Sequence, residues 1–208
     1  MGYATWLPEK MASYGLRVQL YPGWETRGSS YFYPGGVVCH HTASAAGSNM
    51  PSLGVVINGR PDLAGPLCNV LLARDGTCVV IAAGRANHAG SGGYRGLVGN
   101  SSVLGIEAEN NGVGEPWSQA QMDAYIKLAA AMVDGINRDA SWVCAHREWT
   151  SRKIDPTGIN MGIFRAAVAD TLGSGGFDWD AVLAAIEAQR AAAAAAAAAQ
   201  RAKIAVLL

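Results

Sequence analysis

Two histidines stand side by side in one apolar segment of the chain and suggest metal chemistry. His40 and His41 follow Cys39 in the segment VVCHHTAS, residues 37–44. Side chains of a β-strand point alternately to its two faces, so these two imidazoles cannot easily bind one ion together. At most one of them is expected to be a metal ligand, and the segment alone does not say which.

Two further candidate ligands lie in the second half of the chain. His146 ends the apolar segment WVCAH, and Asp155 lies in the polar segment that follows, directly before Pro156. Two imidazoles and one carboxylate, with a fourth position open to water, form a zinc site of the catalytic type. Spacing alone leaves an alternative open, in which His40 is a hydrogen-bonded core residue and Asp155 belongs to a turn.

Two glutamates lie inside another apolar segment, VLGIEAEN, residues 103–110. A carboxylate is costly to bury without a partner, so Glu107, in the middle of this segment, needs either a partner or a chemical role. Glu109 lies two residues further on and shares the face of Glu107 in a regular strand. Strand geometry alone therefore makes Glu109 a rival of Glu107 for any chemical role.

Short apolar stretches predict the strands that would carry these residues. The expected strands are residues 36–42, 103–110 and 142–146, and a hairpin formed by LCNVLLAR and TCVVIAA around Asp75-Gly76. Ser118 to Gln121 has the spacing of a capping box at the start of a helix, and Asn160 can cap another. The apolar faces of these helices are Met122, Tyr125, Ile126, Ala129, Met132, Val133 and Ile136, and Met161, Phe164, Val168 and Leu172. Interleaved strands and helices predict an α/β fold around one sheet.

Two segments depart from this alternating pattern. Residues 84–102 contain six glycines and no periodicity, and a loop of this length in a compact domain is usually functional or mobile. The sequence GSGG at 173–176 separates a domain of residues 1–173 from a glycine-rich hinge and alanine-rich helical tail, residues 174–208. Alanine favours helix but buries little, so the tail is expected to be a spacer. The alternatives are a helix that packs back through Trp179 and Ile186, an oligomerisation element and a membrane-surface element.

Charge and composition exclude several functions. Lysine and arginine number 16, as do aspartate and glutamate, so no net field attracts nucleic acid or an anionic membrane. The first residues lack the basic start and apolar run of a secretory signal, and no stretch is apolar enough for stable membrane insertion. The protein is therefore expected in the cytoplasm. The cysteines, Cys39, Cys68, Cys78 and Cys144, are expected to be buried free thiols.

Four segments taken together resemble a known enzyme family. VVCHHTAS, NHAG, VLGIEAENNG and AHREWTSRKIDP, in this order, are similar to zinc-dependent N-acetylmuramoyl-L-alanine amidases of the amidase-2 and peptidoglycan recognition protein superfamily. The similarity covers residues 35–172 and extends, less specifically, to actinobacterial phage endolysins. It implies a central mixed β-sheet flanked by helices, a Zn²⁺ cofactor, and hydrolysis of the amide between N-acetylmuramic acid and L-alanine of the stem peptide.

The resemblance also implies a role for individual residues. It makes His40, rather than His41, the first zinc ligand, with His146 and Asp155 as the other two. Glu107 would take a proton from the attacking water and pass it to the departing amine, and Lys153 would stabilise the oxyanion. His88, in NHAG, is expected to contact the substrate. The chain reads DPTG where many relatives read DPG, and this inserted Thr157 puts the loop after Asp155 in doubt.

The expected partner is bacterial peptidoglycan, bound by a monomer, or by an oligomer formed through the tail. An endolysin would wait in the host cytoplasm and act on the cell wall after the membrane has been permeabilised. The alternatives are a cytoplasmic amidase that recycles muropeptides, a peptidoglycan-binding module without catalysis, and a different zinc hydrolase that cleaves the stem peptide.

Overall fold

A six-stranded mixed sheet forms the centre of the computed structural model, which describes residues 2–173. The strand order is β1 (Val18–Leu20), β6 (Cys78–Val80), β5 (Val70–Leu72), β9 (Val103–Ala108), β2 (Gly36–His41) and β10 (Val143–Ala145). Neighbouring strands are parallel, except that β5 and β6 form the antiparallel hairpin expected around Asp75-Gly76. The prediction of a mixed sheet is therefore confirmed. The predicted hinge and alanine-rich helix lie outside the described residues.

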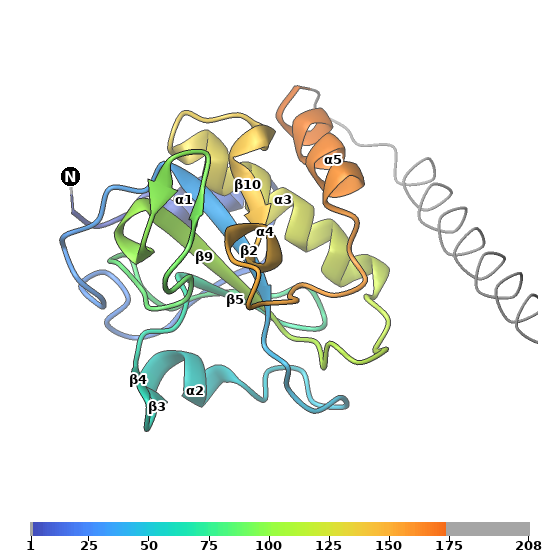
Figure 1. Cartoon of the computed structure of the whole chain (residues 1–208), viewed down its shortest axis with the longest axis horizontal. Helices are drawn as coiled ribbons and strands as arrows, with labels where there is room; N and C mark the ends of the chain where they lie inside the picture. The colour runs from blue at the N-terminus through green and yellow to red at the C-terminus, as the bar shows by residue number, and fades with distance from the viewer. Residues whose placement is uncertain (1, 174–208) are drawn as a thin grey trace, which may run out of the picture.

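Helices cover both faces of this sheet (Figure 1). On one face α1 (Leu7–Ser13) and α5 (Met161–Gly173) each pack against α3 (Gln119–Gly135), which also contacts β2, β5 and β9. The short α2 (Leu53–Asn58) lies at the bottom of the view, beside the small ribbon of β3 (Gly59–Arg60) and β4 (Leu63–Ala64). The helix α4 (His146–Trp149) directly follows β10. No helix within residues 2–173 combines the length and apolarity needed to cross a membrane.

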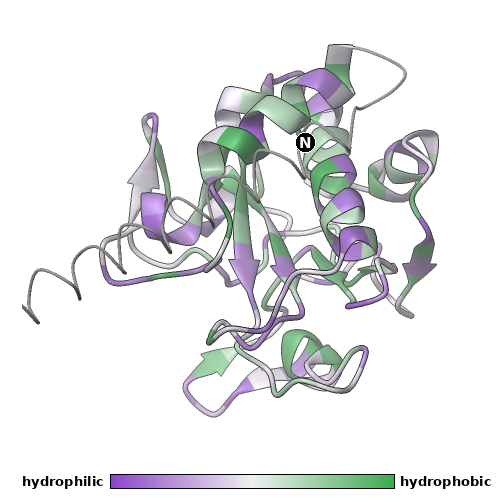
Figure 2. Cartoon of the chain, turned by 90° about the vertical axis from the view of Figure 1, so that its right-hand side faces the viewer, coloured by the Kyte–Doolittle hydropathy of each residue, from purple (hydrophilic) through white to green (hydrophobic). Residues whose placement is uncertain are grey.

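Strand alternation separates the core from the polar face of the sheet. In β2, Val37 and Cys39 belong to the main core beneath α3, whereas Val38 packs with Trp149 on the opposite face. His40 follows Val38 by two residues and therefore lies on that opposite face. Figure 2 shows, in addition, that the central strands change from hydrophobic to hydrophilic colour toward their arrowheads, where His40 lies near the end of β2. All four cysteines are free and buried, as expected.

The two helix starts predicted from the sequence are found at the expected residues. The Ser118 hydroxyl accepts a hydrogen bond from the Gln121 amide (3.2 Å), and Asn160 accepts from the amides of Gly162 (2.9 Å) and Ile163 (3.1 Å). The capping box is only half formed. The Gln121 side chain donates to the Glu109 carbonyl (2.7 Å), so it links α3 to the end of β9 instead.

The glycine-rich segment 84–102 has more structure than its composition predicts. It contains the ribbon of β7 (Gly93–Tyr94) and β8 (Leu97–Val98), followed by the 3₁₀ turn η1 (Asn100–Ser102). A second 3₁₀ turn, η2 (Ala140–Trp142), precedes β10. The Asn100 side-chain oxygen accepts hydrogen bonds from three consecutive amides, those of His88 (3.2 Å), Ala89 (2.8 Å) and Gly90 (3.1 Å). A single side chain thus fixes the path of the NHAG segment.

A hydrogen bond from α3 to β2 gives a test of how this fold holds the strand. The buried Tyr125 hydroxyl donates to the carbonyl of His40 (2.7 Å). Tyr125→Phe is expected to lower the free energy of unfolding by about 1–3 kcal/mol, because a buried acceptor loses its partner. Urea denaturation measures this change, with Tyr31→Phe as the control, since Tyr31 is 66% exposed. Equal stabilities for the two variants would contradict the role of this contact.

Candidate active site

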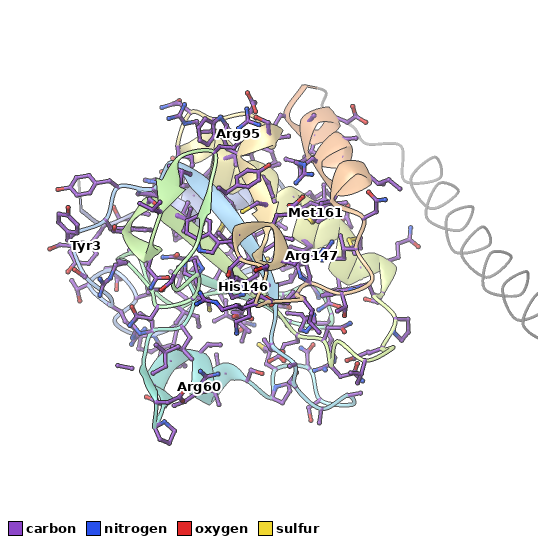
Figure 3. All side chains as sticks on the ribbon, in the orientation of Figure 1. Tyr3, Arg60, Arg95, His146, Arg147 and Met161 are labelled. Carbon is purple, nitrogen blue, oxygen red and sulfur yellow. The ribbon has the colours of Figure 1, made fainter. Side chains whose placement is uncertain are left out.

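Three side chains from distant parts of the chain meet on the polar face of the sheet. His40 lies near the end of β2, His146 begins α4, and Asp155 lies in the loop before α5. The His40 Nδ1 atom is 2.9 Å from His146 Nδ1 and 3.0 Å from Asp155 Oδ2, and the last two atoms are 3.1 Å apart. All three residues are buried. Figure 3 shows His146 in the middle of the view, with Arg147 beside it.

His88 lies directly behind His40 and determines which of its nitrogens carries a proton. His88 Nε2 is 3.2 Å from the Val103 carbonyl and must donate to it, because a carbonyl only accepts. The other nitrogen, Nδ1, is 3.0 Å from His40 Nε2. Burial lowers the pKa of His88 well below its usual value, so the ring is neutral and its Nδ1 accepts. His40 Nε2 therefore carries a proton.

The other ring nitrogen of His40, Nδ1, is then unprotonated and has a lone pair that can bind a metal ion. Burial lowers the pKa of His40 to about 4, although Asp155 acts in the opposite direction, so the ring is neutral near pH 7. A neutral ring with its proton on Nε2 presents a lone pair at Nδ1. This lone pair points at the other two members of the cluster.

The residue after His88 fixes the other histidine in the same way. His146 Nε2 is 3.2 Å from the carbonyl of Ala89 and donates to it, so Nδ1 is the nitrogen that faces the cluster and can bind a metal ion. Residues 88 and 89 thus orient both imidazoles. Gly105 makes room for this arrangement, since a Cβ atom there would lie 2.5 Å from the His88 ring.

The three converging atoms fit a metal ion. Two imidazole lone pairs and a carboxylate oxygen within about 3 Å of each other repel unless a cation lies between them. Nitrogen and oxygen donors are those zinc prefers, and bonds of 2.0–2.1 Å in a tetrahedron put its ligands about 3.3 Å apart. Residues His40, His146 and Asp155 could therefore hold a zinc ion and leave one position open.

Arg147 holds the loop that carries Asp155. Its backbone amide donates to the carbonyl of Asp155 (3.0 Å), and its guanidinium donates to the carbonyls of Pro156 and Ile159, the latter at 2.6 Å. One residue thus ties the segment around Asp155 to the helix that begins with His146. Sequence reasoning missed this role, and the adjacent HR pair was the only signal for it.

The inserted Thr157 is built into the structure. Its amide donates to His41 Nδ1 (3.1 Å), its hydroxyl donates to the Gly112 carbonyl (2.8 Å), and its carbonyl accepts from the Trp117 indole (2.9 Å). His41 lies on the opposite face from His40, as strand alternation predicts, and contacts this loop. Thr157 therefore ties the loop after Asp155 to His41, Gly112 and Trp117.

The two glutamates of β9 have different surroundings. Glu109 is fully buried, and its carboxylate accepts hydrogen bonds from the Thr42, Ser44 and Ser52 hydroxyls and from the Ser52 amide. Glu107 pairs in register with His40 on the adjacent strand, and its Oε2 atom is buried without a hydrogen-bond partner. Burial, reinforced by the charge of Asp155, raises the pKa of Glu107 well above its usual value. Glu109 is thus bound within the protein, whereas Glu107 is available for chemistry.

Lys153 and His88 differ in exposure: the lysine is exposed and the histidine is buried. Lys153 lies two residues before Asp155, and its positive charge partly opposes the rise that burial causes in the pKa of Glu107. His88 was expected to contact the substrate. The structure shows it 9% exposed, with both ring nitrogens engaged by His40 and Val103. A buried ring with both nitrogens engaged is suited to orienting His40, and the expected substrate contact of His88 stays a prediction.

The fold and the site together define an α/β protein with a buried His-His-Asp cluster that could bind a metal ion, and sequence comparison gives its family. Residues 31–158 match the family Amidase_2, described as N-acetylmuramoyl-L-alanine amidase. The chain belongs to this family. The match includes every residue of the cluster.

Solved structures of similar proteins agree with the fold. The structure of a selenomethionine derivative of AmpD has 22% sequence identity and a TM-score of 0.55, covering 73% of this chain and 93% of that one. The endolysin amidase LysCS from Clostridium intestinale has 20% sequence identity and a TM-score of 0.55, and the match covers 72% of this chain and 93% of that one. PlyL has 16% sequence identity and a TM-score of 0.54, and the match covers 77% of this chain and 98% of that one. No curated protein sequence matches the chain.

The contact between His88 and His40 leads to a prediction about metal affinity. His88→Ala is expected to weaken zinc binding by about 10–100-fold, because His40 loses the partner that fixes its proton and ring orientation. Competition with a chromogenic chelator measures the affinity. Asn87→Ala is the matched control, because Asn87 lies next to His88 and its side chain donates to Ala64 and not to a ligand. An unchanged zinc affinity in folded His88→Ala would refute the positioning role.

Proposed function

We propose that the chain is a zinc-dependent peptidoglycan amidase that cleaves the bond between N-acetylmuramic acid and the first L-alanine of the stem peptide. The observation that carries the proposal is the convergence of three lone-pair donors, His40, His146 and Asp155, beside the unpartnered carboxyl of Glu107. Membership of the Amidase_2 family supports the choice of substrate.

The three donors would hold the zinc ion, and each is already oriented by the protein. Val103 and His88 align His40, Ala89 aligns His146, and Arg147 holds the backbone around Asp155. When bound, zinc lowers the pKa of water and polarises a carbonyl group. Because the donors are aligned in advance, little reorganisation is needed when the ion and the substrate bind.

Glu107 is the general acid and base of the proposed reaction. Its raised pKa suits a group that takes a proton from the attacking water and then gives it to the departing amine of L-alanine. The carboxyl forms no bond to the protein through Oε2, so this atom can face a reactant. The pairing of Glu107 with His40 in register places both side chains on one face of neighbouring strands.

Lys153 supplies positive charge on the solvent side of the same site. This charge acts to lower the pKa of both His40 and Glu107, against the larger effect of burial on Glu107. It would stabilise an oxyanion that develops beside them. The substrate is a polymer that must reach the site from outside, which suits an exposed lysine better than a buried one.

We further propose that the enzyme acts in phage lysis, from the host cytoplasm, once the membrane has been permeabilised. LysCS, a protein of similar fold, is described as an endolysin. A cytoplasmic recycling amidase is the alternative. The two predict different preferences, because an endolysin cleaves intact cell-wall polymer and a recycling enzyme prefers soluble muropeptides. A binding module without catalysis is less consistent with the free carboxyl of Glu107.

The two glutamates of β9 provide a matched test of this mechanism. Glu107→Gln is expected to lower the release of stem peptides from peptidoglycan by about 10²–10⁴-fold while zinc remains bound, because an amide cannot transfer the proton. Glu109→Gln is expected to keep its activity and to lower the free energy of unfolding by about 1–3 kcal/mol, because its buried hydrogen bonds are disturbed.

Three measurements are needed for both variants: stem peptide release, zinc content and urea unfolding. The proposal fails if Glu107→Gln is folded, zinc-loaded and fully active. It also fails if Glu109→Gln alone loses activity without losing stability.

A further inference from the structure

A cavity of about 560 Å³ lies beside α2 and the β3–β4 ribbon, away from the zinc ligands themselves. It is open to the surface and is polar. Its lining comes from three parts of the chain: Arg27, Gly28 and Ser29; Ile57, Asn58, Gly65 and Pro66; and Arg85 and Asn87. Two guanidinium groups and no carboxylate line this cavity, so its charge favours an anion.

The two arginines of the cavity differ in their bonding. Arg27 is fixed, because its guanidinium donates to the carbonyls of Ile81 (2.7 Å) and Pro22 (2.6 Å) and stacks on the ring of Tyr21. Arg85 has no ion pair and no side-chain hydrogen bond to any of residues 2–173, and its Nε atom is buried without a partner. A buried charged donor without an acceptor is costly, and such groups in native proteins usually have a ligand or water as partner.

The backbone holds the two arginines on the same wall. Ser29 and Arg85 exchange backbone hydrogen bonds of 3.3 Å and 2.9 Å. Gly28 permits this close approach, since a Cβ atom there would lie 2.6 Å from the Arg85 carbonyl. The position of Arg85 therefore does not depend on its side chain, which is left free to bind a ligand.

The wall of the cavity is continuous with the segment that orients the zinc ligands. Asn87 lines the cavity, and the next two residues, His88 and Ala89, contact His40 and His146. A molecule bound in the cavity would thus lie against the same loop that carries the catalytic arrangement. Peptidoglycan stem peptides carry free carboxylates some residues away from the bond to muramic acid.

We propose that this cavity binds an oxyanion, a carboxylate of the stem peptide or a phosphate, through the guanidinium of Arg85. An arginine fork matches either group with two parallel hydrogen bonds. The stem-peptide source rests on the proposed amidase function, whereas the phosphate source does not. In both cases the anion would accept from the terminal Nη atoms of Arg85, which have no hydrogen bond to any of residues 2–173, since the Nε atom itself is buried.

Calorimetric titration of the full chain tests the site without requiring catalysis. The probes are the free stem tripeptide, the same peptide with its carboxyl groups amidated, and inorganic phosphate. Arg85→Met is expected to weaken binding of the carboxylate peptide, or of phosphate, by about 10–100-fold. Arg17→Met is the control, since Arg17 lies outside the cavity and is 65% exposed. Thermal unfolding shows whether the variants fold, and Arg85→Gln is the second variant if Arg85→Met does not.

The outcomes separate the two sources and the two proposals. Loss of peptide binding in Arg85→Met, together with weak binding of the amidated peptide, identifies a stem-peptide carboxylate. Phosphate binding that depends on Arg85, without peptide binding, identifies phosphate as the ligand. A chain that cleaves peptidoglycan but binds neither probe through Arg85 refutes the cavity and leaves the proposed function intact. Anion binding through Arg85 in a chain that cleaves no peptidoglycan supports the cavity as an anion site and refutes the proposed amidase function.

Discussion

The parallel pairing of β2 with β9 is the constraint on which the site depends, because it sets His40 opposite Glu107. Alternation in β2 sends Val37 and Cys39 into the core under α3 and leaves His40 on the other face. A slip of one residue would exchange these faces, burying His40 in the core and removing it from Glu107. The apolar core therefore enforces the register, and the register places His40, a candidate metal ligand, beside Glu107, the proposed general base.

Orientation of the three candidate metal ligands comes from residues outside the cluster. His88 and the Ala89 carbonyl give each histidine a defined proton and leave its Nδ1 atom free, while Arg147 holds the loop of Asp155. Asn100 in turn fixes the segment that contains His88 and Ala89. The glycine-rich segment is thus an ordered support behind the metal centre. The cavity at Arg85 joins the same support on its other side.

The sequence allowed the strands, the helix starts and the members of the His40, His146 and Asp155 cluster to be predicted. The strands and helix starts follow from local patterns, whereas the cluster was found through the resemblance of four segments to a known family. Strand alternation, the Ser118 and Asn160 caps and the turn at Asp75-Gly76 each depend on neighbours within a few residues. The supporting contacts did not follow from sequence, because they join distant segments. His88 meets His40 across 48 positions, and nothing near His88 marks it as buried. The role of Asn100 was hidden for the same reason, since its three amide partners lie 10 to 12 residues earlier.

Product analysis by mass spectrometry tests the central claim most directly. Purified peptidoglycan is incubated with the protein, with and without a chelator, and the zinc content of the protein is measured in parallel. The account predicts stem peptides with a free L-alanine amino terminus, intact glycan strands, about one zinc per chain, and loss of products on chelation. Cleavage within the glycan or within the stem peptide would contradict it. So would release of the same products by protein that contains no metal.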